Sequence, residues 1–111
     1  MPKREIAELD LSPRHLAVLR QLLAQYAPQA QVWVYGSRVT GGAHEGSDLD
    51  IVLRNPANLN QAIAVWCDLQ EALRESDLPM LIDLHDWARL PPEFQRNIER
   101  AYVELQPGDE A

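Results

Sequence analysis

The spacing of apolar residues changes along this chain, from a helical repeat to a continuous run. In the first third, apolar side chains recur every three or four positions, as on one face of an α-helix: Leu16, Leu19, Leu22, Leu23 and Tyr26. Ser12 and Pro13 fit the N-cap and first turn of this helix, and Pro28 marks its end. Residues 32–35 are uninterrupted β-branched and aromatic residues, which indicates a strand covered on both faces that ends at Gly36.

The second half of the chain repeats this alternation. Residues 48–53 predict another strand, which an Asn-Pro turn signal closes. A helical stripe follows, beginning near an Asn58 cap and made of Leu59, Ile63, Trp66, Leu69 and Leu73. Residues 80–84 predict a third short strand. Two consecutive prolines then introduce a last amphipathic helix, whose apolar positions are Phe94, Ile98, Tyr102 and Leu105.

This order of elements predicts an α/β (α+β) fold with a small three-stranded mixed sheet flanked by helices. Every segment is needed to cover that sheet, so we expect residues 1–111 to form a single domain with a core of about residues 12–105. A chain of this size buries roughly two thirds of its unfolded surface around one core.

The charge and composition of the chain limit the classes of binding partner that we expect. Ten Lys and Arg against seventeen Asp and Glu give a net charge of −7, and no basic cluster is present. Nucleic acid is therefore not expected as a direct partner, whereas a basic protein surface would be attracted. The sequence has no apolar run long enough to span a membrane, no secretory leader and a single cysteine, Cys67, so a cytoplasmic location is expected.

An aspartate pair opens the predicted strand at residues 48–53. Asp48 and Asp50 are two positions apart, so on a strand they project from the same face, with Cα atoms about 6.5–7 Å apart. Carboxylates so placed can share a divalent ion, and hard oxygen ligands favour Mg²⁺ or Mn²⁺ over zinc. Alternatively, Asp48 ends a loop and Asp50 lies on a solvated face.

A third acid, Asp83, makes a cation site the simpler interpretation. It lies in the apolar stretch MLIDLHD, where burial of an unpaired carboxylate is costly. If the third strand lies beside the second, Asp83 reaches the same place as Asp48 and Asp50. Three converging acids repel one another and raise each other's pKa unless a cation neutralises them.

Two neighbours of Asp83 have less definite roles. His85 shares the face of Asp83 by parity and fits either a position at the rim of the site or a supporting role. Asp86 falls beyond the predicted strand and is interpreted as a solvated or helix-capping residue.

The turn after the first strand suggests a phosphate site. Gly36 and Ser37 end a strand and begin a short helix, an arrangement whose backbone N–H groups can bind phosphate. Glycine permits close approach because it lacks a Cβ, and the serine hydroxyl can donate a further hydrogen bond. A Gly-Ser turn by itself is common; next to a metal-binding pair it indicates the phosphate end of a nucleotide site.

Taken together, these motifs resemble the DNA polymerase beta-type nucleotidyltransferase superfamily. Gly-Ser is followed by ten residues, Asp-x-Asp and a later acid on an apolar strand. The segments VYGSR, SDLDIVL and IDLHDWARLPPEFQRNIERAYVEL, with the Gly-Gly of the connecting loop, are similar to the minimal nucleotidyltransferase branch. Members of that branch pair with HEPN-domain proteins in toxin–antitoxin systems. The resemblance extends over about residues 12–105 and implies the nucleotidyltransferase fold.

The resemblance implies a role for each matched residue. Gly36 and Ser37 would hold the triphosphate of ATP or another NTP. Asp48 and Asp50 would bind Mg²⁺, and Asp83 would complete the metal site and help to deprotonate the acceptor hydroxyl. The reaction would be attack of that hydroxyl on the α-phosphorus with release of pyrophosphate, a reaction governed by positioning and charge neutralisation.

Arg38 is open to two interpretations, a phosphate contact or a structural ion pair. The loop RVTGGAHEG departs from the commoner Arg-Ala-Arg-Gly form after this residue. A second phosphate-binding arginine is therefore not carried over from the resemblance.

Larger relatives carry an additional domain that positions the acceptor, and this chain has no residues left for one. The resemblance implies an HEPN-type toxin as the partner in a hetero-oligomer, silenced by transfer of AMP to a tyrosine hydroxyl. The alternative is an antitoxin that neutralises its partner by occlusion without catalysis, through exposed apolar residues such as Trp87, Leu90 and Phe94. A third alternative is a small α/β domain with an acid-rich rim and no such activity.

Overall fold

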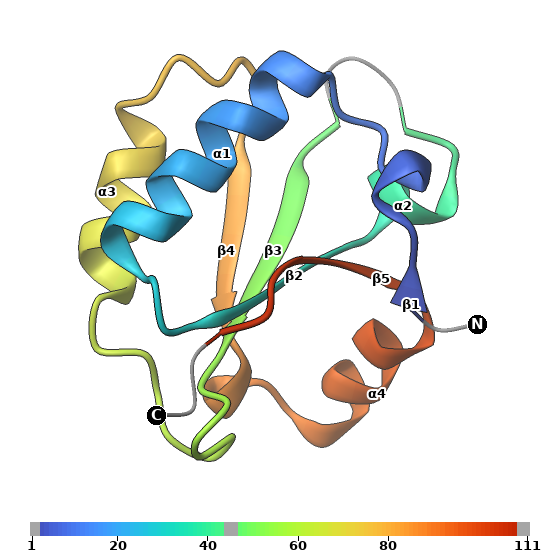
Figure 1. Cartoon of the computed structure of the whole chain (residues 1–111). Helices are drawn as coiled ribbons and strands as arrows, with labels where there is room; N and C mark the ends of the chain where they lie inside the picture. The colour runs from blue at the N-terminus through green and yellow to red at the C-terminus, as the bar shows by residue number, and fades with distance from the viewer. Residues whose placement is uncertain (1–2, 44–46, 109–111) are drawn as a thin grey trace.

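The computed structural model describes residues 3–43 and 47–108, and these form one mixed sheet with helices packed on both of its faces (Figure 1). The strands are β1 (Lys3–Arg4), β2 (Gln31–Tyr35), β3 (Leu49–Arg54), β4 (Ile82–Asp86) and β5 (Tyr102–Gln106). The helices are α1 (Pro13–Tyr26), α2 (Ser37–Thr40), α3 (Trp66–Arg74) and α4 (Pro92–Arg100), with 3₁₀ turns η1 (Ile6–Glu8) and η2 (Trp87–Arg89).

The sheet confirms the predicted fold class but has five strands in the order β1-β5-β2-β3-β4 rather than three. The two central pairings, β5 with β2 and β2 with β3, are antiparallel, whereas β1 with β5 and β3 with β4 are parallel. β3 and β4 therefore run in the same direction, and their N-terminal ends lie beside the C-terminal end of β2. The candidate site lies at this end of the three strands.

The prediction of one long C-terminal helix was wrong. α4 ends at Arg100, and residues 102–106 form β5, which is inserted beside β2 in the middle of the sheet. Tyr102 and Leu105 continue the helical spacing of α4, but Val103 and Leu105 also alternate as a strand with one buried face. Short apolar runs fit both periods, and pairing with β2 decides between them.

Two other boundaries also moved. The predicted Asn58 cap lies in a turn-rich segment, and α3 begins at Trp66. The third predicted strand starts at Ile82 and extends to Asp86. In contrast, α1 follows the prediction, because the Ser12 hydroxyl accepts a hydrogen bond from the His15 amide at 3.3 Å and caps the helix.

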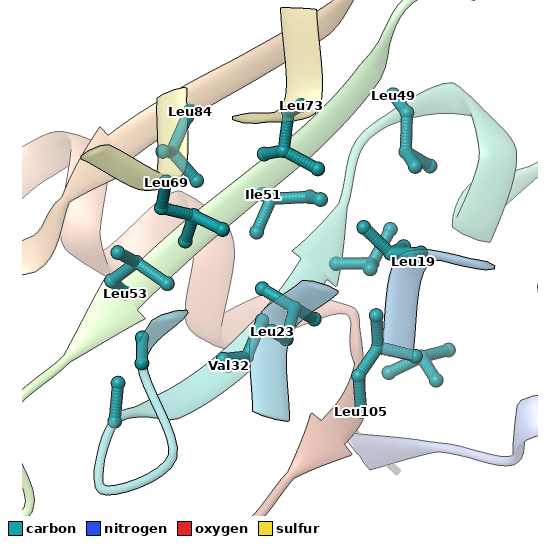
Figure 2. Close-up of a cluster of buried hydrophobic side chains, with 14 of the residues drawn as sticks. Leu19, Leu23, Val32, Leu49, Ile51, Leu53, Leu69, Leu73, Leu84 and Leu105 are labelled. Carbon is teal, nitrogen blue, oxygen red and sulfur yellow. The ribbon is translucent and has the colours of Figure 1, made fainter. Parts of the chain in front are cut away.

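The larger core lies between the sheet and the helices α1 and α3. Inward positions of β2 and β3 are fully buried against Leu19, Leu23 and Leu69 of those helices (Figure 2). The inward residues of the two strands are Val32, Val34, Leu49, Ile51 and Leu53. These residues alternate with others that face the opposite side, so the strands have a fixed register, since a slip of one residue would invert both faces.

The opposite face of the sheet is covered by η2 and α4. Its buried cluster consists of Trp33, Tyr35, Val52, Trp87 and Ile98. Trp33 meets Trp87 edge to face at 5.6 Å and stacks on Tyr102 at 3.8 Å between ring centroids. Both faces of β2 are thus apolar, which explains its uninterrupted apolar sequence.

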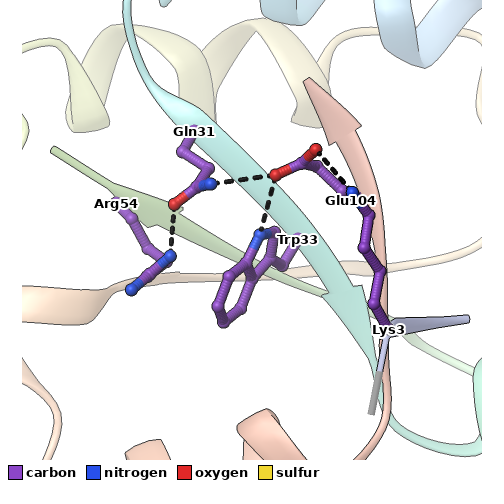
Figure 3. Close-up of polar contacts among 5 residues, drawn as sticks. All are labelled: Lys3, Gln31, Trp33, Arg54 and Glu104. Carbon is purple, nitrogen blue, oxygen red and sulfur yellow. Dashed lines mark hydrogen bonds and ion pairs between the residues drawn. The ribbon is translucent and has the colours of Figure 1, made fainter. Parts of the chain in front are cut away.

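A polar network joins four strands, β1, β5, β2 and β3, at the far end of this second face (Figure 3). Glu104 accepts hydrogen bonds from Gln31 Nε2 at 2.9 Å and Trp33 Nε1 at 3.4 Å, and it pairs with Lys3 Nζ at 3.2 Å. Arg54 donates to the side-chain oxygen of Gln31. Its guanidinium lies 3.8 Å from the ring centroid of Trp33, so burial of this cation is offset by a cation–π contact.

The Glu104 network predicts a pH-dependent part of the stability. Partial burial works to raise the pKa of Glu104, but hydrogen bonds from Gln31, Lys3 and Trp33 outweigh it and hold that pKa below its ordinary value of 4.5. The ionised form is therefore favoured by folding. Its contribution is present above pH 4.5 and is lost as the pH falls through the lowered folded-state pKa.

We expect Glu104→Gln to lower the free energy of unfolding by about 1–3 kcal/mol at pH 7. The difference between the two proteins should shrink as the pH falls below 4.5. Urea unfolding at several pH values measures it, and a difference independent of pH would contradict the assignment.

Candidate active site

The three predicted acids lie at the end of the sheet where β2 ends and β3 and β4 begin. Asp50 of β3 lies opposite Tyr35 of β2 on one side and Asp83 of β4 on the other. Asp48 is exposed and immediately precedes β3. Leu49 and Ile51 are fully buried on the opposite face, which confirms that the aspartates project away from the larger core.

Asp50 and Asp83 are close enough for their side chains to share a hydrogen bond. Burial raises the pKa of Asp50, and the negative charges of Asp83 and then Asp48 raise it further. His85 acts in the opposite direction. Since folding holds the carboxyl groups together, this edge of the sheet concentrates negative charge that a cation would relieve.

The donor chemistry of this cluster fits a hard divalent cation such as Mg²⁺ or Mn²⁺. Asp50 and Asp83 offer carboxylate oxygens on adjacent strands, and the charge of Asp48 reaches Asp50 from the exposed end of β3. Over residues 3–43 and 47–108, no three His, Cys, Asp or Glu side chains already stand close enough together to hold a metal ion. The assignment of Asp48, Asp50 and Asp83 as metal ligands thus stays a prediction.

The Gly36 turn lies directly against the acid cluster. Gly36 has φ 87° and ψ −161°, a backbone conformation that is nearly restricted to glycine. A Cβ at this position would lie 2.3 Å from Asp50 Oδ2, so the absence of a side chain is what admits the carboxylate. α2 starts at the next residue, Ser37, and the amides of Val39 and Thr40 donate to the Gly36 carbonyl. The candidate phosphate turn and the acids therefore share one site.

Arg38 is buried and donates to backbone carbonyls. Its Nη1 is 2.8 Å from the Asp10 oxygen, and Nε and Nη2 are 3.1 and 2.8 Å from the Ser47 oxygen. These contacts hold the residue before Asp48 against the N-terminal segment. They support a structural role, made through carbonyl groups, and a contact between Arg38 and phosphate stays a prediction.

Three aromatic side chains, His85, Tyr35 and Phe94, lie near the acids, and the sequence predicted a position at the site only for His85. His85 Nε2 lies 3.1 Å from Asp83 Oδ2 and its ring is 5.8 Å from that of Phe94. Tyr35 is buried beside Phe94, and burial, followed by the charges of Asp50 and Asp83, raises the pKa of its hydroxyl. The parity of β2 and the pairing of β2 with β3 place Tyr35 beside the acids. That pairing cannot be predicted from the local sequence.

The prediction that Asp86 is solvated was wrong, and the alternative that it caps a helix is confirmed. It is 5% exposed rather than solvated, and it is the last residue of β4. Its carboxylate accepts from the Ala88 amide at 3.3 Å, capping η2, and from the Ile63 amide at 2.8 Å. Asp86 therefore anchors the turn-rich segment before α3.

Comparison with known proteins agrees with this geometry. Residues 18–110 match the family described as polymerase beta, nucleotidyltransferase, and the chain belongs to that family. Its resemblance to the minimal nucleotidyltransferases is thereby confirmed, and the protein is a nucleotidyltransferase. It is 39% identical over 100 residues to the probable protein adenylyltransferase MntA of Haemophilus influenzae, an alignment that covers 90% of this chain and 86% of that relative.

Within the described residues, no helix has the length and apolar character needed to cross a membrane.

The close approach at Gly36 predicts different consequences for two glycines of similar backbone conformation. Gly36→Ala and Gly41→Ala should each lower the free energy of unfolding by about 1–3 kcal/mol, because both residues have positive φ. Open space surrounds Gly41, whereas a Cβ at Gly36 meets the end of the Asp50 side chain. Only Gly36→Ala should therefore move the Asp50 carboxylate.

NMR titration of the side-chain carboxyl groups, without added metal, measures this effect. The pKa of Asp50 should return toward its ordinary value in Gly36→Ala and stay raised in Gly41→Ala. Equal behaviour of Asp50 in the two variants would contradict the role assigned to Gly36.

Proposed function

We propose that this protein transfers AMP from ATP to a hydroxyl group, that of a tyrosine, on a partner protein, an HEPN-type toxin that is thereby silenced. The observation that carries the proposal is the packing of Asp50 against both Gly36 and Asp83 on three adjacent structural elements. The name of the Haemophilus influenzae relative, a probable protein adenylyltransferase, supports the nucleotide and the class of acceptor.

The proposed step is a single displacement at phosphorus. The acceptor oxygen forms a bond to the α-phosphorus of ATP, and the bond from that phosphorus to the oxygen bridging to the β-phosphate breaks. Pyrophosphate leaves with the electron pair of the broken bond, and Asp83 accepts the proton of the attacking hydroxyl. Gly36 and Ser37 hold the triphosphate so that the leaving group stays in line with the attacking oxygen.

Asp48, Asp50 and Asp83 would hold Mg²⁺ or Mn²⁺ in this proposal. Bound there, the cation supplies positive charge against the phosphate oxygens and against the carboxylates. The carboxylate of Asp50 is positioned by β3, whose other face is fully buried, and that of Asp83 by β4, whose other face includes the buried Leu84, so the strands hold both before ligands arrive.

Neutralisation by occlusion has weaker support from the surface. Of the three side chains considered for it, Trp87 is 6% exposed and belongs to the second core cluster, with Leu90 packed against that cluster. Phe94 is 39% exposed, but its ring contacts those of Tyr35 and His85 at the edge of the candidate site.

Intact mass spectrometry tests the transfer. A partner protein of the HEPN type, incubated with this protein, Mg²⁺ and each NTP in turn, should gain one or more adenylates from ATP. Asp50→Asn should abolish the gain, and Asp77→Asn, which removes one exposed carboxylate outside the cluster, should preserve it. A silenced partner with no mass gain in any sample would instead establish neutralisation by occlusion.

Thermal unfolding tests the metal assignment separately from transfer. Without metal, Asp50→Asn should leave the melting temperature unchanged or higher, because it removes a carboxylate whose pKa folding raises. Mg²⁺ with ATP should raise the melting temperature of the wild type, by roughly 4–8 °C per kcal/mol of binding free energy. The rise should be lost in Asp50→Asn and kept in Asp77→Asn; an equal rise in all three proteins would contradict the assignment.

A further inference from the structure

A cavity of about 480 Å³ opens beside the acid cluster, on the β4 side of the sheet. Asp48 and Asp83 contribute to its lining. Most of its wall comes from α3 and from the segment between α3 and β4, including Leu73, Leu78, Pro79, Met80 and Leu81. Gly36, Ser37 and Asp50 do not line it, so the cavity is distinct from the candidate phosphate turn.

The order of strands places the part of the acid cluster that lines this cavity away from the phosphate turn. Across the sheet, Gly36 follows the end of β2, Asp50 lies on β3 and Asp83 lies on β4, and of these three residues only Asp83 lines the cavity. In a displacement at phosphorus, the attacking and leaving oxygens lie on opposite sides of the phosphorus. If the triphosphate lies at Gly36 and Ser37, the leaving group is on the β2 side, and the attacking hydroxyl must come from the β4 side.

The chemical character of the lining residues limits which hydroxyl-bearing side chain fits as the attacking group. Six of the ten lining residues are apolar, and the polar ones are Asp48, Gln70, Arg74 and Asp83. A side chain with an apolar ring and a terminal hydroxyl can contact both kinds of lining residue, which describes tyrosine better than the short side chains of serine and threonine. Arg74 also lines the cavity and offers a cation to an aromatic ring.

Leu81 is the lining residue whose exposed apolar surface a bound aromatic ring would cover. Its side chain is 75% exposed, which leaves a large apolar surface in water two residues from Asp83. By strand parity it faces the same way as Asp83, and its carbonyl accepts from the Leu49 amide at 2.9 Å, so its backbone is fixed. An aromatic side chain over Leu81 would remove this surface from water.

We propose that this cavity is the acceptor site, and that it receives the tyrosine side chain of the partner with Leu81 as the contact that positions the ring and Asp83 at the hydroxyl. The inference rests on the proposed function for the identity of the reaction. It adds the place at which the acceptor binds and the residues that select an aromatic hydroxyl.

Transfer kinetics test the site with a matched pair of variants. Leu81→Gln removes the apolar contact without changing charge, and Leu59→Gln makes the same change at another exposed leucine that lies outside the cavity. Leu81→Gln should lower kcat/KM for the protein acceptor by about tenfold or more, with KM for ATP unchanged. Leu59→Gln should match the wild type; equal activity in all three proteins would overturn the proposal.

Binding of a small probe tests the cavity without any transfer. In amide NMR spectra of the ¹⁵N-labelled protein, N-acetyl-L-tyrosinamide should shift the signals of Leu81, Ile82 and Asp83. Leu81→Gln should lose these shifts and Leu59→Gln should keep them. Shifts confined to other parts of the chain, no shifts up to the solubility of the probe, or the same signals responding to ATP in place of the probe would overturn the assignment.

The two experiments distinguish failure of the acceptor-site proposal from failure of the proposed function. Probe binding at Leu81 in a protein that transfers nothing to its partner would uphold the cavity and refute the proposed function. Transfer that is indifferent to Leu81, together with no probe binding, would uphold the function and refute the cavity.

Discussion

The structure of this site depends on two carboxylates being held side by side on parallel strands. Asp50 and Asp83 are in register, and folding leaves them no freedom to separate because the alternate residues of β3 are locked in the larger core. Burial and the neighbouring acids raise the pKa of Asp50, which is the sign of a site that is less favourable empty than neutralised. The apolar face of β3 thus supplies the stability that its acidic face lowers.

Gly36 restricts the position of Asp50 from the β2 side, as Asp83 does from the β4 side. A side chain there would occupy the position of the Asp50 carboxylate, so the backbone of the turn itself forms one wall of the acid cluster. The Gly36 turn, β3 and β4 therefore form one structural unit. Arg38 extends the unit by fixing the carbonyl of Ser47, next to the aspartate that begins β3.

The features that the sequence predicted were those decided by local period and parity. Asp48 and Asp50 could be placed on one face by parity, and Asp83 beside them on the condition that the third strand lies beside the second, which the pairing of β3 with β4 fulfils. β5 was missed because Tyr102 and Leu105 fit a helix as well as a strand, and only pairing with β2 distinguishes them. Tyr35 at the site and the contacts of Glu104 depend on the same long-range pairing.

The two ends of the second sheet face differ in how closely their charges are compensated. At one end Glu104 is met by Lys3 and by neutral donors, while Arg54 lies against two indole rings at 3.8 and 4.5 Å. At the other end, the contact that the described residues make to the three carboxylates is that of His85 Nε2 with Asp83 Oδ2 at 3.1 Å. Asp48 and Asp83 are exposed and Asp50 is partly buried, and burial and the charges of the other two raise the pKa of Asp50. A cation bound at this end would relieve that repulsion, which is the role that the proposed function gives it.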